Sequence, residues 1–99
     1  PGQDPAQGVS ALDFVTVRPC RFDAFEAVPR DRLSLDLDDC ERLLKDAGYE
    51  VVSNAGVMLV VRKGVDVTVY PHGRLLIHPV KDKALAERAA EEVYHSLGM

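Results

Sequence analysis

Four short runs in the second half of the chain alternate or concentrate apolar residues as β-strands do. They are Glu50 to Ser53, Val57 to Arg62, Val65 to Tyr70 and Arg74 to Val80. The separators are Asn54-Ala55-Gly56, Lys63-Gly64 and Pro71-His72-Gly73. Each separator holds a Gly, or an Asn that tolerates positive φ, as tight hairpin turns require. The pattern predicts four consecutive antiparallel strands.

A helix is predicted before these strands. Its apolar residues recur at helical spacing: Leu37, Cys40, Leu43, Leu44 and Ala47. Asp36 is suited to cap the first turn, where further acidic side chains favour the positive end of the helix dipole. Gly48 supplies the left-handed stop.

A second helix is predicted from about Asp82 to the end of the chain. One broad side carries Leu85, Ala86, Ala89, Ala90, Val93 and Leu97, followed by Gly98. Its many alanines indicate close packing against a sheet.

The N-terminal third is less regular. Residues 1–9, rich in Pro, Gly and Gln, are expected to be a flexible tail, and residues 10–99 a single domain. Leu12 to Arg18 is β-branched and aromatic and is predicted to be the first strand. Arg21 to Leu33 is expected to be a connection laid over an edge of the core, because it carries Phe22, Phe25, Val28 and Pro29.

These elements predict an α+β fold with the order β-α-β-β-β-β-α. Its five strands would form one antiparallel sheet, with both helices packed on one face. Alternation then places Val65, Val67, Val69, Leu75 and Ile77 toward the helices. The other face would hold Met58, Val60, Arg62, Asp66, Thr68, Tyr70, Arg74, Leu76 and His78.

Composition fits one ordinary globular domain. The 99 residues are 46% hydrophobic and 28% charged, with a net charge of −4. The longest apolar run, Val57 to Val61, is far shorter than the roughly 20 residues of a membrane span, and neither a span nor a signal peptide is expected. Cys20 and Cys40 are too few for a disulfide framework and favour a reducing cytoplasm.

The chain resembles one repeat of the TATA-box-binding protein (TBP) family. The resemblance lies in the β-α-β4-α order and in the pattern from Val65 to Met99: an alternating strand, a turn ending in Gly73-Arg74, an apolar strand and a long Ala-rich helix. It implies a TBP-like half-saddle. The family has two tandem repeats, so a saddle here would require a dimer.

The residues with which that family kinks DNA are not matched. It inserts paired phenylalanines between base steps, whereas the three phenylalanines here are Phe14, Phe22 and Phe25, none of them in a hairpin turn. TATA recognition is therefore not expected.

An apolar sheet face with basic edges on an acidic chain suggests an interaction surface. Its formal charge is about +1, counting Arg62, Arg74 and Asp66 with neutral His. The favoured hypothesis is a non-catalytic binding or assembly module that uses this face for self-association, as a dimer, or for a protein partner. The proposed interaction face comprises Met58, Val60, Arg62, Thr68, Tyr70, Arg74, Leu76 and His78. The alternative is that this face has no binding function and is covered by the N-terminal segment or by the Arg21 to Leu33 connection.

Two other functions stay open. A nucleic-acid-binding protein would use Arg62, Arg74 and Lys63 on phosphates and Tyr70 to stack a base. A small enzyme or enzyme subunit would draw on His72, His78 and His95, although no pair has a spacing that demands chemistry.

No cofactor or metal is expected. The cysteines and histidines lack zinc-ligand spacing, and the acidic residues from Asp36 to Asp39 lack the Gly and distal Glu of an EF-hand. Nucleotide-binding and nucleophile-elbow motifs do not occur.

Overall fold

The computed structural model describes residues 14–17, 23–31 and 33–98 as an α+β fold with one antiparallel sheet. The strand order is β1-β2-β6-β5-β4-β3. The strands are β1 (Phe14–Val17), β2 (Phe25–Pro29), β3 (Glu50–Asn54), β4 (Leu59–Lys63), β5 (Val65–Val69) and β6 (Leu75–His78). The helices are α2 (Leu37–Asp46) and α3 (Lys83–Ser96). The predicted tail, residues 1–9, lies outside the described residues.

The sheet has six strands and not the predicted five, because part of the expected connection is strand β2. Phe25 and Ala27 of β2 are buried and pair with Ile77 and Leu75 of β6. Only five residues alternate in this strand and the last is Pro29, so the period-two signal is short and its end looks like a loop. The predicted first strand contains β1, which pairs with β2 at the edge of the sheet.

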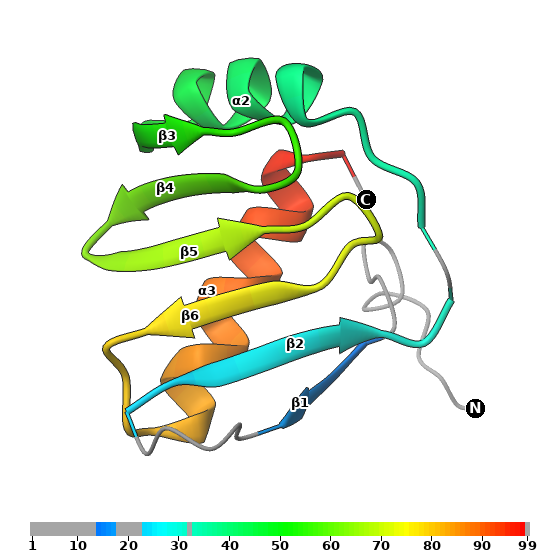
Figure 1. Cartoon of the computed structure of the whole chain (residues 1–99). Helices are drawn as coiled ribbons and strands as arrows, with labels where there is room; N and C mark the ends of the chain where they lie inside the picture. The colour runs from blue at the N-terminus through cyan, green and yellow to red at the C-terminus, as the bar shows by residue number, and fades with distance from the viewer. Residues whose placement is uncertain (1–13, 18–22, 32, 99) are drawn as a thin grey trace.

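In the view of Figure 1, α3 passes behind the sheet and α2 lies along the top, above β3, so the front face of the sheet has no helix on it. α2 packs on β3 and β4, while α3 packs on β1, β2 and β6. Asp36 caps α2 as predicted, because its Oδ1 accepts hydrogen bonds from the backbone nitrogens of Asp38, at 2.9 Å, and Asp39, at 3.4 Å. Asp82 caps α3 by accepting from the nitrogen of Ala84, at 2.9 Å.

The core lies between the sheet and the helices. From the sheet come Ala27, Leu59, Val61, Val67, Val69, Leu75 and Ile77, and from the helices come Leu37, Cys40, Leu44, Ala90, Val93 and Tyr94. The inward-facing residues predicted for β5 and β6 are confirmed, except that Val65 is only half-buried. Leu85, expected on the packed side of α3, is 54% exposed. Tyr94 takes part in the core instead, with its ring 5.2 Å from that of Phe14.

Two hydrogen bonds hold the turn between β5 and β6, one from α3 and one from the segment that precedes α2. The Tyr94 hydroxyl donates to the carbonyl oxygen of Gly73 at 2.7 Å, and the nitrogen of Leu35 donates to the carbonyl of Pro71 at 2.7 Å. Gly73 has φ +101°, and a Cβ there would lie 2.7 Å from Leu33 Cδ1. Glycine is thus required at Gly73 for conformation and for space.

The outer strand β3 has an irregular register. Val51 pairs with Val61 and Ser53 pairs with Val60, so Val52 is an extra residue in a β-bulge. Val52 is 44% exposed. No helix among the described residues has the length and apolar character needed to cross a membrane.

Candidate interaction face

The strand register places a central row of the predicted face across four strands. Leu76 of β6 pairs with Thr68 of β5, Thr68 pairs with Val60 of β4, and Glu26 of β2 pairs with Leu76. Their chain neighbours, among them Leu75, Ile77, Leu59 and Val61, are fully buried against the helices. Since alternate residues point to opposite faces, this row points away from the helices.

A second row lies nearer one end of the strands and is polar. His78 pairs with Asp66, Asp66 with Arg62, and Arg62 with Glu50. Toward the other end lie Tyr70, Arg74 and Met58. The backbone nitrogen of Tyr70 donates to the carbonyl of Arg74 at 3.0 Å across the turn. The register therefore places Val60, Arg62, Thr68, Leu76 and His78 on one face. Met58, Tyr70 and Arg74 continue the same alternation just beyond the strand ends.

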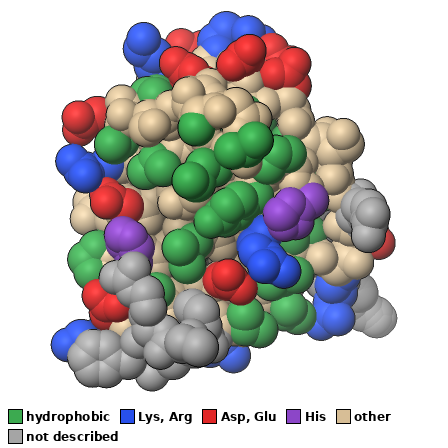
Figure 2. Space-filling view, in the orientation of Figure 1, with side chains coloured by type: hydrophobic (Ala, Val, Ile, Leu, Met, Phe, Trp, Pro, Cys, Tyr) green, Lys and Arg blue, Asp and Glu red, His purple; other side chains and the backbone are tan. Residues whose placement is uncertain are grey.

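Figure 2 shows this face of the molecule. Hydrophobic side chains gather over the middle of the sheet, with charged side chains and histidines around them. Met58 is 39% exposed, and Val60, Tyr70 and Leu76 are half-buried. No described element packs over this face. Its apolar side chains are therefore open to another molecule, as an interaction surface requires.

Arg62 is held by an ion pair within the face. Its Nε donates to Asp66 Oδ1 at 2.6 Å and its second nitrogen lies 3.4 Å from Oδ2. This hydrogen bond lowers the pKa of Asp66 and, with the attraction between the charges, raises that of Arg62. The guanidinium is therefore already matched by a carboxylate.

Arg74 has a looser acidic neighbour. Its guanidinium lies 3.9 Å from Glu26 Oε2, which is too long for a hydrogen bond. Its Nε is the one buried side-chain nitrogen or oxygen in the described part of the chain that has no hydrogen-bond partner. This nitrogen is buried, so another molecule cannot reach it directly, whereas 43% of the Arg74 side chain is exposed.

The expected charge of about +1 is wrong for the complete face. Glu26 pairs with Leu76 and Glu50 pairs with Arg62, and these two negative charges change the formal charge of the face from +1 to −1. The strand β2 and its Glu26 were missed because the segment was expected to be a connection. Glu50 heads a strand that was predicted, but its place beside Arg62 depends on register.

Lys63 does not belong to this face. Its Nζ donates to Glu92 Oε2 of α3 at 3.0 Å and to the carbonyl of Ala47 at 3.2 Å, and it lies 4.9 Å from the centre of the Tyr49 ring. The lysine expected to contact phosphate is thus on the helix side. Alternation along β4 could have shown this, because Arg62 and Lys63 are consecutive.

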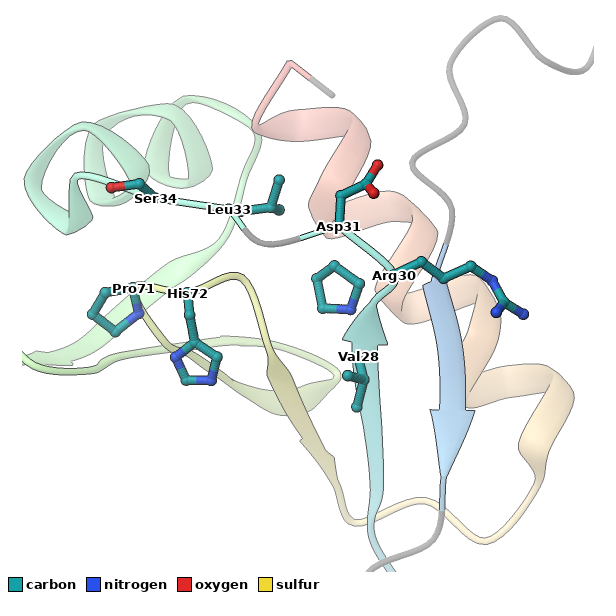
Figure 3. A pocket seen from close by; sticks show the side chains of 8 residues that line it. Val28, Arg30, Asp31, Leu33, Ser34, Pro71 and His72 are labelled. Carbon is teal, nitrogen blue, oxygen red and sulfur yellow. The ribbon is translucent and has the colours of Figure 1, made fainter.

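A groove adjoins the face beyond the end of β2. It has a volume of about 890 Å³ and is lined by Val28, Pro29, Arg30, Asp31, Leu33, Ser34, Pro71 and His72. In Figure 3, Val28, Leu33 and His72 border the hollow between β2 and the β5–β6 turn, whereas the side chain of Arg30 points away from it. The ring of His72 lies 5.9 Å from that of Tyr70, which connects the groove to the apolar part of the face.

The three histidines are not brought together. His72 precedes β6 in its turn, His78 ends the same strand, and His95 lies in the last turn of α3 on the other side of the sheet. Among the described residues there is no group of three or more His, Cys, Asp or Glu that could hold a metal ion. Cys40 is buried, and this burial raises its pKa; Cys20 lies outside the described residues.

No family model, curated protein or solved structure matches this chain. The resemblance to a TBP repeat therefore stays a prediction from the sequence pattern.

Proposed function

We propose that this protein is a non-catalytic assembly module whose sheet face binds a second copy of the chain. The observation that carries the proposal is the uncovered row across β4, β5 and β6, in which the apolar Val60 and Leu76 flank Thr68. A second copy that covers this row removes apolar surface from water. This stabilises the complex by roughly 25 cal/mol for each Å² of apolar surface buried.

Charge complementarity favours a second copy over other occupants. A two-fold axis brings the same face to itself, so a suitable face carries both signs of charge. Glu26 and Arg74 are neighbours on this one, and 43% of the Arg74 side chain is exposed. A carboxylate of the partner copy can pair with the exposed part of the Arg74 side chain, and a face with a formal charge of only about −1 meets itself with little repulsion.

Nucleic acid is a weaker candidate for the same face. Phosphate binding needs several cations that are free to release counterions. Arg62 is paired with Asp66, Arg74 lies beside Glu26, and Lys63 is on the helix side.

The test is the solution mass of the purified protein over a concentration series by light scattering, at low and high salt. Parallel samples contain short duplex or single-stranded DNA. We expect a concentration-dependent dimer whose mass DNA does not change. A monomer at every concentration overturns the proposal, and a gain of mass with DNA that salt reverses would favour nucleic acid.

A further inference from the structure

A second hollow lies on the helix side of the sheet, away from the interaction face. It has a volume of about 690 Å³, and its apolar lining includes Val65, Ile77, Val80, Leu85 and Ala89. This size is within the range of small-molecule sites, roughly 300 to 1,000 Å³.

The hollow follows from the way the helices share the sheet. α2 packs on β3 and β4, and α3 on β1, β2 and β6. The beginning of β5 lies between these areas, so Val65 is only half-buried and Leu85 of α3 is 54% exposed beside it. An apolar molecule seated here would cover both side chains.

Five charged residues border the hollow, and four of them already interact with other groups. Glu92 accepts from Lys63 at 3.0 Å, and Asp82 caps α3. Asp23 and Lys81 each have an interaction of their own. Arg88, which is exposed, has neither an ion pair nor a hydrogen bond with any described residue. The Arg88 guanidinium is therefore the rim group that no described residue engages.

From this geometry we propose that the hollow binds a small carboxylic acid with an apolar body. The body lies against Val65, Leu85 and Ala89, and the carboxylate accepts hydrogen bonds from the Arg88 guanidinium, whose fork suits two oxygens. A cationic ligand of equal length would gain no such hydrogen bonds from Arg88. The site does not depend on self-association, since it lies on the opposite side of the sheet.

The test is a titration of the isotope-labelled protein followed by amide NMR, with octanoate and octylammonium as probes of equal chain length. We expect octanoate to shift the signals of Val65, Leu85 and Ala89 saturably, and to bind at least about threefold more tightly than octylammonium, the effect of one exposed charge pair. Arg88→Gln should weaken octanoate binding by about the same factor.

Arg42→Gln is the matched control, because Arg42 is an exposed helix arginine paired with Asp39 on α2, outside this hollow. It should bind octanoate like the unaltered protein. The proposal is overturned if octanoate causes no saturable shift at the hollow, if octylammonium binds equally well, or if Arg88→Gln leaves octanoate affinity unchanged.

Discussion

The hydroxyl of Tyr94 donates a hydrogen bond to the carbonyl oxygen of Gly73 at 2.7 Å inside the core. It joins α3 to the turn between β5 and β6, although Tyr94 and Gly73 are 21 positions apart along the chain. Because this turn carries Tyr70, His72 and Arg74, the contact also holds one end of the interaction face and of the adjoining groove in place.

Tyr94→Phe should therefore lower the free energy of unfolding by about 1–3 kcal/mol, since it leaves the buried carbonyl of Gly73 without its donor. Chemical denaturation would measure the loss. Tyr70→Phe is the control, because Tyr70 is half-exposed and has no side-chain hydrogen bond with a described residue. That variant should stay within about 0.5 kcal/mol of the unaltered protein. Equal losses in the two variants would contradict the role given to the Tyr94 hydroxyl.

Gly73→Ala should destabilise the protein more than Gly64→Ala. Both glycines have positive φ, at +101° and +84°, so each alanine costs about 1–2 kcal/mol of backbone strain. Only at Gly73 would the new Cβ collide with Leu33 Cδ1, at 2.7 Å, whereas at Gly64 nothing lies within 4 Å. Overpacking adds about 1–3 kcal/mol. Thermal unfolding of the two variants compares them directly, and equal midpoints would contradict the close packing of Leu33.

Alkaline pH should destabilise the fold through its buried tyrosines. Burial, together with Glu92, raises the pKa of Tyr49 from 10.0 to about 12. Burial also raises the pKa of Tyr94 well above its ordinary value. The folded state thus favours the neutral phenols. Their contribution to stability is complete below a pH of about 10, the pKa in the unfolded chain, and is lost as pH rises toward and beyond the folded values. Thermal unfolding across this window should show falling midpoints, and the fall should be shallower in Tyr94→Phe.

Met58→Asp should leave the monomer folded and abolish self-association, because it places an unpaired charge in the apolar area between two copies. Leu76→Asp should do the same from the neighbouring strand β6. Leu43→Asp is the control: Leu43 is 38% exposed on α2, and Met58 is 39% exposed on the sheet face. Light scattering should show monomers for the two sheet-face variants and dimers for the control. Circular dichroism checks the fold, and its collapse in both sheet-face variants would mean that the face is core.

The sequence predicted β3 to β6 and both helices because their local signals agree. Each hairpin has a glycine or asparagine in its turn, and Asp36 and Gly48 mark the two ends of α2. The strand β2 could not be recognised in the same way. Its burial comes from β6 on one side and α3 on the other, which are distant in sequence, and tertiary packing of this kind has no local signature.

The sequence predicted most of the residues on the candidate interaction face, but it did not predict how their charges are balanced. Alternation placed Leu76, Thr68 and Val60 on one face because strand side chains have a period of two. It could not show that Asp66 would neutralise Arg62, or that Glu26 would lie near Arg74. These pairings depend on register and on a strand that the pattern did not reveal, so the balance of charge on the face required the structure.

The bulge at Val52 would limit how the proposed assembly could grow. A regular outer strand would offer its backbone to a further strand, and each added copy would expose a new edge to the next. The shift between Val51 and Ser53 interrupts that ladder on β3. In the proposed dimer, pairing through the sheet face would use up the same surface on both copies, so assembly would stop at two and would not extend into filaments.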